Sequence, residues 1–346
     1  MAPSAAIGLD DMTETVMVTG GTGFIGGWCI VEALKRGYGV RTSVRSGAKE
    51  AGVRALVAAA GLDPALVTFA HADLTRDDGW EPAVAGCDYV LHVASPLSGG
   101  AVVDRNAYVA PARDGSLRVL RAATKAGVKR VVMTSASAAA RAPLRSGRTG
   151  DETVWSDPED AQFDAYRVSK ILAERAAWDY MREVGAEQRF TTILPGAVFG
   201  PVLTKETIGS VGIIRGLLHG QPPGVPRIGF WVVDVRDLAA LHVDAMTAPA
   251  AAGERFIAAG EFMWMGELAD TLRVALGPRG ARVPTRRLPD VLVRLLATFT
   301  PNLRQVTPLL GVKFIQTSEK ARRSLGFSPR PARETIVDCA ESLLAL

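Results

Sequence analysis

Tyr166 and Lys170 are the residues of this chain whose types and spacing best suit acid–base chemistry. They stand four positions apart in an apolar helical pattern over 165–183, so their side chains would share one face of a helix. A free phenol, with a pKa of about 10, is a poor proton donor or acceptor near neutral pH. A neighbouring cation favours the phenolate and brings that pKa toward the working range. The pair therefore predicts proton transfer at a carbonyl or alcohol, although a surface pair is the alternative for this motif alone.

Glycines gather directly after a predicted strand at Thr15–Thr19. The segment VTGGTGFIG (18–26) spaces them as G-x-x-G-x-x-G from Gly20 and as G-x-G-x-x-G from Gly21, and both patterns end at Gly26. A turn without Cβ atoms lets the backbone approach a pyrophosphate, and the N-terminus of the following helix offers N–H groups to it. A preceding strand and a following helix are the context that this motif requires, so the segment predicts nucleotide binding.

The end of the next predicted strand, Gly39–Val44, bears on the choice between NAD and NADP. An NAD site usually carries an acidic residue about 20 positions after the glycine loop, where it binds the ribose 2′-hydroxyl. The sequence VRTSVR instead ends this strand at Arg45, without an acid. Because a guanidinium suits a 2′-phosphate, we predict NADP(H), with Lys49 as a further candidate contact. The alternative is that Arg41 and Arg45 are solvated charges.

Short β-branched runs alternate with longer Ala- and Leu-rich helical stretches over the first two hundred residues. The alternation predicts an α/β fold, a Rossmann-type doubly wound parallel sheet with helices on both faces. The predicted strands are Thr15–Thr19, Gly39–Val44, Val67–Ala70, Asp88–Val93, Arg130–Thr134 and Phe190–Leu194. The predicted helices are Trp28–Lys35, Ser116–Ala126, Ala165–Glu183, Met265–Leu276, Asp290–Phe299 and Glu334–Leu346.

Prolines and glycines become more frequent after Pro195, and the strand–helix rhythm changes. We therefore expect a dinucleotide-binding domain over 1–201, flexible over 1–12, and a smaller mixed substrate lobe over 202–346. Some segments of that lobe would return to the first domain. Ligands of open parallel sheets bind at the carboxyl ends of the strands, so the lobe would cover the site.

The end of the fifth predicted strand reads Thr134-Ser135-Ala136-Ser137, in which every residue except Ala136 carries a hydroxyl. A serine here would donate a hydrogen bond to the substrate oxygen and stabilise the charge that develops on it.

These segments together resemble an extended short-chain dehydrogenase/reductase, closest in pattern to the dihydroflavonol reductase-like aldehyde and ketone reductases. Their order and spacing agree with that family over nearly the whole chain. The matching segments are VTGGTGFIG (18–26), VRTSVR (40–45), ADL (72–74), LHVASP (91–96), YRVSK (166–170), PGAVFGP (195–201), DVRDLAALHVDAM (234–246) and TSEKARRSLGF (317–327).

The resemblance implies an NADPH-dependent carbonyl reductase in which Tyr166 donates the proton, while Lys170 binds the ribose hydroxyls and tunes Tyr166. It also implies a set of cofactor contacts that follows the cofactor from one end to the other. These are Gly20, Thr22, Gly23, Phe24, Ile25 and Gly26 at the pyrophosphate, Arg45 at the 2′-phosphate, Asp73 and Leu74 beside the adenine, Val93, Ala94 and Ser95 along the middle, and Pro195, Gly196 and Val198 along the nicotinamide.

One position departs from the family. Members usually have Thr-Ser-Ser after the fifth strand, with the second serine catalytic, and this chain has Ala136 there. Either Ser137 or Ser135 takes the role, or the contribution of the serine is weakened. We lean slightly to Ser137.

Charge and hydropathy exclude other classes of protein. The 40 basic and 36 acidic residues give a net charge of +4, without the clustered basic run that nucleic-acid binding needs. We find no signal peptide and no run of the ~18 apolar residues that a membrane span takes. We therefore expect a cytoplasmic protein that binds neither nucleic acid nor membrane.

The sequence also gives no sign of a metal or disulfide site. The cysteines, Cys29, Cys87 and Cys339, are widely spaced and predicted to be reduced, mostly buried thiols. The four histidines are scattered without acids at ligand spacing, so no metal is expected. Of these, His92 is predicted to be a satisfied core or cofactor-side residue rather than a catalytic base.

We expect a small-molecule carbonyl substrate, fairly apolar, with Phe230 and Trp231 as candidate pocket residues, and a monomer or homodimer. Trp264 and Met265 are candidates for either the pocket or the core, and we favour the core. The segment Leu288–Phe299 is either a lid or an ordinary packed helix.

Other functions compete with carbonyl reduction. Within the same family, the alternatives are a hydroxysteroid dehydrogenase and a sugar-nucleotide epimerase, but an epimerase should prefer an acid where Arg45 stands. From a different class, a non-catalytic NADP-sensing regulator would have no use for Tyr166 and Lys170.

Overall fold

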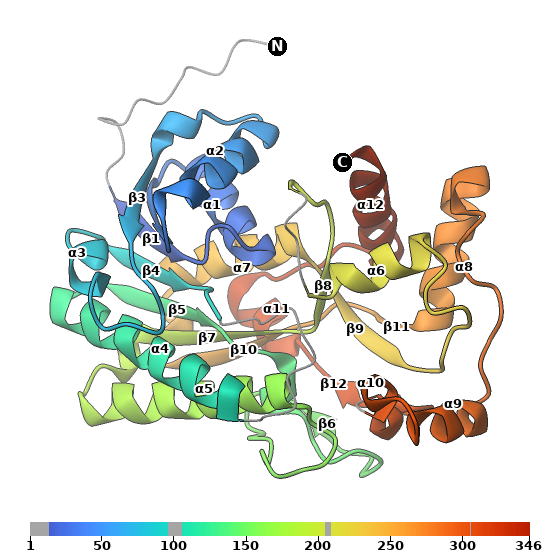
Figure 1. Cartoon of the computed structure of the whole chain (residues 1–346). Helices are drawn as coiled ribbons and strands as arrows, with labels where there is room; N and C mark the ends of the chain where they lie inside the picture. The colour runs from blue at the N-terminus through green and yellow to red at the C-terminus, as the bar shows by residue number, and fades with distance from the viewer. Residues whose placement is uncertain (1–13, 96–105, 205–208, 305) are drawn as a thin grey trace.

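A seven-stranded, all-parallel sheet forms the centre of the molecule (Figure 1). The computed structural model describes residues 14–95, 106–204, 209–304 and 306–346. Residues 1–12 and Pro96, which enter the predictions above, lie outside these ranges. In order across the sheet the strands are β10 (Glu254–Ala258), β7 (Phe190–Pro195), β5 (Arg130–Thr134), β4 (Tyr89–His92), β1 (Thr15–Thr19), β2 (Gly39–Val44) and β3 (Val67–His71).

Helices cover both faces of this sheet, as Figure 1 shows. This arrangement confirms the predicted Rossmann-type doubly wound fold. The helices on one face are α1 (Phe24–Lys35), α2 (Glu50–Ala59), α7 (Val235–Thr247) and α11 (Glu319–Leu325); those on the other are α3 (Trp80–Val84), α4 (Asn106–Ala126) and α5 (Ala165–Glu183). Because both faces are covered, the central strands are largely buried, and Val16, Met17 and Val18 of β1 are fully buried.

A smaller mixed sheet begins where β7 ends. Only Gly196 separates β7 from β8, so the small sheet starts at the carboxyl edge of the large one. Its strands are β8 (Ala197–Phe199), β9 (Gly229–Asp234) and β11 (Phe262–Trp264), and its helices are α6 (Val211–Leu218), α8 (Met265–Leu276) and α12 (Ala332–Ala345). Two further helices follow, α9 (Asp290–Ala297) and α10 (Pro301–Arg304). A short parallel pair joins β12 (Ile315–Gln316) to β6 (Thr149–Gly150).

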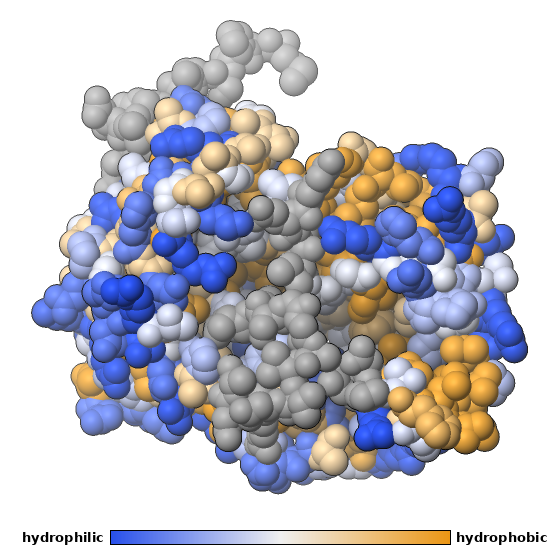
Figure 2. All heavy atoms as spheres, viewed as in Figure 1, coloured by the Kyte–Doolittle hydropathy of each residue, from blue (hydrophilic) through white to orange (hydrophobic). Residues whose placement is uncertain are grey.

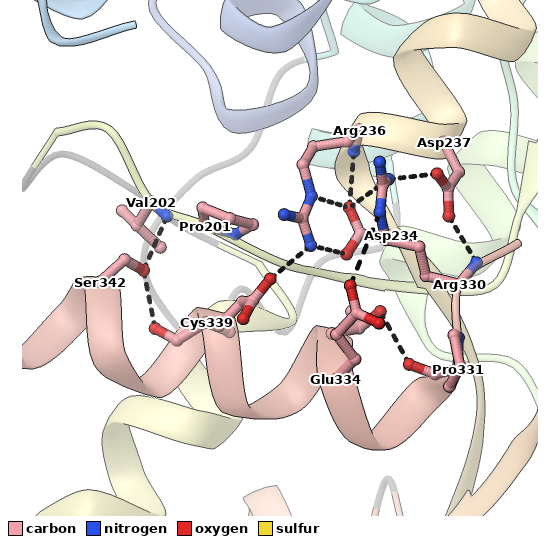
Figure 3. A network of polar contacts seen from close by, with 12 residues as sticks. Pro201, Val202, Asp234, Arg236, Asp237, Arg330, Pro331, Glu334, Cys339 and Ser342 are labelled. Carbon is pink, nitrogen blue, oxygen red and sulfur yellow. Dashed lines mark hydrogen bonds and ion pairs between the residues drawn. The ribbon is translucent and has the colours of Figure 1, made fainter.

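An ion-pair network at the start of α7 holds α12 in place (Figure 3). Asp234 caps α7 by accepting the Arg236 N–H at 2.8 Å and also pairs with the guanidinium of that arginine. Arg236 reaches on to Asp338 of α12, at 2.6 Å. Farther along α12, the Ser342 hydroxyl accepts the N–H of Val202, just beyond β8, at 2.8 Å. The network thereby fixes the position of β8 relative to the large sheet.

Two helices begin earlier than the sequence pattern predicts, because glycine and proline obscure it. α1 starts at Phe24 rather than Trp28, and the glycines in its first turns are required by close contacts. A Cβ on Gly27 would lie 2.3 Å from Leu56 Cδ1. α4 starts at Asn106 rather than Ser116 and includes Pro111.

The segment Leu288–Phe299 is not a buried helix. Within α9 only Val293 and Ala297 are buried, whereas Val291 is 78% exposed and Phe299, just beyond it, 82%. Figure 2 shows the resulting hydrophobic patch at the lower right of the molecule, where Figure 1 places α9 and α10. Met265 is a core residue as predicted, while Trp264 is only partly buried.

Candidate functional site

The glycine loop joins β1 to α1 in a form that only glycine permits. Gly20 has a φ of +75°, and its carbonyl accepts the N–H of Gly23 at 2.9 Å. A Cβ on Gly20 would lie 2.9 Å from Ala94 Cα, and one on Gly26 only 2.2 Å from the Gly20 oxygen. No side chain caps α1, and its first turn carries no acidic residue. The loop and helix end thus leave space and positive potential, which fits a pyrophosphate at this position.

The hydroxyl of Thr19 holds the ends of β1 and β4 together. Its Oγ1 accepts the N–H groups of Val93 and Ala94, each at 3.0 Å, and therefore donates its own proton to His92 Nδ1 at 2.9 Å. His92 carries its proton on Nε2, which donates to Ser116 Oγ at 3.1 Å. Burial lowers the pKa of His92 to about 3. The ring is neutral with both nitrogens used, so the structure confirms a satisfied core histidine.

Arg45 is exposed at the carboxyl end of β2 and lies near Asp73, which follows β3. Backbone and side-chain hydrogen bonds from Thr75 lower the pKa of Asp73, with the Arg45 charge contributing. Arg41 has a different role, because its guanidinium donates to the carbonyls of Ala83 and Ala85 at 3.1 and 2.7 Å. Arg41 is therefore neither a solvated charge nor a cofactor contact, whereas Arg45 has the exposure that a 2′-phosphate contact needs.

Leu74, the second predicted adenine neighbour, packs on α4. A Cβ on Gly115 would lie 2.8 Å from Leu74 Cβ, and the Leu74 carbonyl accepts from Arg118 Nη1 at 2.9 Å. Lys49 lies in a short 3₁₀ turn, Gly47–Lys49, between β2 and α2. Lys49 thus follows the carboxyl end of β2, and Leu74 follows that of β3.

Tyr166 and Lys170 lie in the first turns of α5, behind an N-cap at Asp164 that accepts the N–H of Arg167 at 2.8 Å. Lys170 is buried, and its Nζ donates to the carbonyl of Thr134, the last residue of β5, at 3.0 Å. The hydroxyl of Thr134 donates to His242 Nε2 at 2.7 Å. Lys170 is thus fixed to the end of β5, and with Tyr166 half-buried the two do not form an exposed surface pair.

The pKa values of Tyr166 and Lys170 are shifted in opposite directions. Burial raises the pKa of Tyr166 to about 12, and the charge of the adjacent Arg167 partly opposes this shift. Burial lowers the pKa of Lys170 to about 8, with Glu174 acting against it. At neutral pH the phenol therefore keeps its proton, while the ammonium is largely charged. This state is suited to proton donation.

A buried ion pair beneath Lys170 was not predicted from the sequence. Glu174, one turn farther along α5, is fully buried and pairs with Arg255 Nε of β10 at 2.8 Å. It also accepts the Thr192 hydroxyl of β7 at 2.8 Å and the Ser135 hydroxyl at 2.6 Å. The one feature that could have indicated it is an acid four residues after Lys170 on the same helix face.

The two candidate serines have different surroundings. Both side chains are buried, but Ser135 commits its hydroxyl proton to Glu174. Ser137 begins a 3₁₀ turn, Ser137–Ala140, and its carbonyl accepts from Gln316 Nε2 at 2.7 Å. Only Ser137 therefore has a hydroxyl that is not tied to the buried ion pair.

The segment from Pro195 to Val198 crosses from the large sheet to the small one. The N–H of Gly196 donates to the Ala258 carbonyl at 3.0 Å, and a Cβ on Gly196 would lie 2.2 Å from the Trp231 oxygen. Trp231 in turn donates from Nε1 to the Phe314 carbonyl at 2.9 Å. The predicted cofactor and catalytic residues thus follow the carboxyl ends of β1, β2, β3, β4, β5 and β7 along one edge of the sheet.

The cysteines, Cys29, Cys87 and Cys339, are free and buried, as predicted. Within the described ranges no three His, Cys, Asp or Glu side chains are grouped so that they could hold a metal ion. Among the helices of those ranges, none combines the length and the apolar character needed to span a membrane.

Comparison with known proteins agrees with this geometry. Residues 16–259 match the family model described as the NAD dependent epimerase/dehydratase family. A dihydroflavonol 4-reductase of Arabidopsis thaliana is 37% identical over 197 residues, which is 55% of this chain and 51% of that enzyme. A bifunctional dihydroflavonol 4-reductase/flavanone 4-reductase of Malus domestica is 33% identical over 269 residues, 75% of this chain and 76% of that enzyme.

Solved structures show the same relationship. The yeast methylglyoxal/isovaleraldehyde reductase Gre2, complexed with NADPH, superposes with a TM-score of 0.79 at 26% identity, over 96% of this chain and 98% of that one. Gre2 of Candida albicans in complex with NADPH gives a TM-score of 0.77 at 25% identity, over 96% and 99% of the two chains. The chain belongs to the NAD dependent epimerase/dehydratase family and, within it, to the extended short-chain dehydrogenases/reductases of the dihydroflavonol reductase-like group.

Proposed function

We propose that this chain is an NADPH-dependent carbonyl reductase that converts a ketone or aldehyde to an alcohol, with Tyr166 as the proton donor. The protein is an NADP-dependent oxidoreductase, as its relatives among the reductases indicate. One observation carries the further step to carbonyl reduction. Lys170 is buried and fixed on the Thr134 carbonyl, one helical turn from a protonated Tyr166, at the sheet edge where the glycine loop opens.

The residues of the first strands would hold the cofactor. Gly20, Gly23 and Gly26 leave the backbone open to the pyrophosphate, and the uncapped N-terminus of α1 supplies N–H donors. Arg45 would bind the 2′-phosphate through charge-assisted hydrogen bonds. When bound, NADPH supplies a hydride from C4 of its nicotinamide. Gly196, which lies against Trp231, would let that ring approach the backbone between the two sheets.

Tyr166 would supply the proton that the reduced oxygen needs. Its phenol is protonated at neutral pH, because burial raises its pKa to about 12. The Lys170 ammonium would hold the ribose hydroxyls and stabilise the phenolate that remains after transfer. Since Glu174 lies one turn beyond, its charge helps Lys170 to stay protonated in its buried position. Tyr166 and Lys170 thus have separate tasks, proton donation and electrostatic support.

Ser137 would donate the second hydrogen bond to the substrate oxygen. The family position is occupied by Ala136, and the Ser135 hydroxyl is already used by Glu174. Ser137 starts the turn that follows Ala136, and Gln316 anchors its carbonyl. We therefore assign the oxygen-stabilising role to Ser137 and a structural role to Ser135.

The remaining expectations follow from this assignment. We propose a fairly apolar small-molecule substrate, because the half-buried aromatic rings of Phe230 and Trp231 lie on β9, beside Gly196. Residues 1–201 would hold the cofactor, and the lobe over 202–346 would choose the substrate. A cytoplasmic location and a monomeric or homodimeric state stay predictions.

The test is the loss of NADPH absorbance with a panel of ketones and aldehydes. We expect turnover by the wild type and a loss of nearly all turnover in Tyr166→Phe, which should still bind NADPH. Tyr180→Phe, in the same helix about four turns away, is the matched control and should remain active. Full activity of Tyr166→Phe would contradict the proposal, and tight NADPH binding without any turnover would favour a regulator.

The same assay separates the remaining alternatives. An epimerase would interconvert sugar nucleotides without net consumption of NADPH, and Arg45 argues against that function. A hydroxysteroid dehydrogenase would select the steroids within the carbonyl panel.

A further inference from the structure

Arg141 is a buried cation without a hydrogen-bond partner for two of its nitrogens. The residue is 7% exposed, and within the described part of the chain both Nε and Nη1 are buried without a hydrogen-bond partner. The rings of Phe314 and Phe163 lie 3.9 and 5.6 Å from its guanidinium carbon, which stabilises the charge but supplies no acceptor. Burial lowers the pKa of Arg141 to about 9, so the guanidinium keeps its charge at neutral pH. Leaving such donors unmet is costly, so they point to a missing acceptor.

The acids nearest to Arg141 are engaged elsewhere. Asp164 pairs with Arg167 and caps α5, and Asp160 accepts the amide of Gln162 at 2.7 Å. Both carboxylates influence the charge on Arg141, but neither forms an ion pair with it among the described residues. The guanidinium therefore still lacks a direct anionic partner.

A second unsatisfied group lies against the same stretch of backbone. Gln316 donates from Nε2 to the Ser137 carbonyl, which fixes the orientation of its amide, yet its Oε1 is buried and unbonded. The Gln316 side chain packs by Gly150, where a Cβ would lie 3.3 Å from Gln316 Cγ and 3.4 Å from the Ala142 nitrogen. Polar groups without partners among the described residues are therefore concentrated in this region, although only the donors of Arg141, and not the Gln316 oxygen, suit an anionic ligand.

The position of Arg141 connects it to the proposed reaction. It directly follows the 3₁₀ turn that Ser137 begins, and a rise of about 2 Å per residue places the two Cα atoms roughly 8 Å apart. Phe314, whose ring lies over the Arg141 guanidinium, also accepts a hydrogen bond at its backbone carbonyl from the Trp231 indole N–H. The backbone oxygen of Trp231 in turn lies against Gly196. Contacts through Phe314 and Trp231 therefore connect Arg141, next to the turn Ser137–Ala140, with Gly196 in the proposed nicotinamide segment.

We propose that Arg141 binds a carboxylate of the substrate, so that this chain reduces oxo acids in preference to neutral carbonyl compounds. The inference rests on the proposed carbonyl reduction and names its substrate class. A carboxylate brings both the charge and the two acceptor oxygens that a guanidinium needs. The rings that cover Arg141 come from two distant parts of the chain, Phe163 ahead of α5 and Phe314 ahead of β12. A substrate carboxylate would have to reach the guanidinium beside these two rings.

The test compares each of three acids, levulinate, acetoacetate and benzoylformate, with its methyl ester. For the best acid, we expect the wild type to show a higher kcat/KM than for its ester. In Arg141→Met, which keeps most of the side-chain volume, the ratio of acid to ester should fall about 100-fold, because a buried charged hydrogen bond is lost. Arg141→Lys should restore part of the ratio, since it keeps the charge.

Arg130→Met is the matched control. Arg130 also has a buried, unbonded Nε, but it lies at the opposite end of β5, and its Nη1 donates to the Ala245 and Ala248 carbonyls. Its substitution removes a partly buried guanidinium and should leave the acid-to-ester ratio unchanged. An equal loss of that ratio in both variants would indicate a structural role for Arg141 and overturn the inference.

A binding measurement separates this inference from the proposed function. The acids should raise the melting temperature of the wild-type NADP⁺ complex, in which they cannot be reduced, and this shift should be absent in Arg141→Met. Acid binding without any carbonyl turnover would refute the reductase and keep the carboxylate site. Turnover of the esters with no preference for the acids, or no thermal shift with any acid, would refute the carboxylate site.

Discussion

Replacing Glu174 by glutamine should destabilise the protein and shift its pH profile together. The variant keeps the side-chain size but leaves Arg255 buried at 6% exposure without its counter-charge. Breaking a buried pair in this way costs about 3–5 kcal/mol of unfolding free energy. With an unfolding entropy of about 2.1 cal/mol/K per residue, a 346-residue chain changes by about 0.7 kcal/mol/K. We therefore expect the melting temperature to fall by about 4–7 °C.

Differential scanning calorimetry of the purified variants measures this shift. Glu183→Gln, an exposed acid at the end of the same helix, is the control and should change the melting temperature little. A double variant, Glu174→Met with Arg255→Met, should lose less stability than the two single changes added together, because it leaves neither charge unpaired. A Glu174→Gln protein that melts within about 1 °C of the wild type would refute the ion-pair reasoning.

The same variant has a second readout that a purely structural role would not move. The charge of Glu174 raises the pKa of Lys170 against the effect of burial. Its removal should therefore lower that pKa, and the alkaline decline of carbonyl reduction should begin at a lower pH. An unchanged profile, alongside a lowered melting temperature, would separate the stabilising role of Glu174 from any role in tuning Lys170.

Three further results are expected. Gly26→Ala places a Cβ 2.2 Å from the Gly20 oxygen. The strain of about 1–3 kcal/mol should weaken NADPH binding about tenfold to hundredfold in titration, while Gly52→Ala, with open space around it, should not. Arg45→Glu should lower the NADPH-to-NADH ratio of kcat/KM by at least about tenfold, and an unchanged ratio would remove Arg45 from the cofactor site. Carbonyl reduction should be steady below pH 8 and slow as the pH rises through about 8, because Lys170 loses its proton there; a rate that stays constant to about pH 10 would contradict this.

The large sheet was predictable because its strands are buried on both faces. A parallel strand in that position is a short run rich in β-branched and apolar residues, and the predicted bounds of β1, β2 and β5 agree with those observed. β10 was not predicted, since it joins the sheet through β7 only after the chain has built α6, β9 and α7. Its partner lies far back in the sequence, where no local pattern points to it.

The site was predictable where a residue acts through its own type and spacing. Tyr166 and Lys170 share one helix face, and the glycine loop needs residues without a Cβ at positions where a Cβ would clash. The Glu174–Arg255 pair depends on two elements that meet only in the folded sheet, and so does the commitment of the Ser135 hydroxyl to Glu174. Contacts of this kind decide which of two neighbouring serines is free, and a linear pattern does not contain them.

Transfer of a labelled hydride tests the central claim most directly. NADPH carrying deuterium at both hydrogen positions of nicotinamide C4 is incubated with the protein and a carbonyl compound that it consumes, and the alcohol is analysed by mass spectrometry. Carbonyl reduction predicts one deuterium on the alcohol carbon with wild-type protein, and almost no labelled alcohol with Tyr166→Phe in the same time. Consumption of NADPH without deuterium in the alcohol, or equal labelling by Tyr166→Phe, would contradict the account.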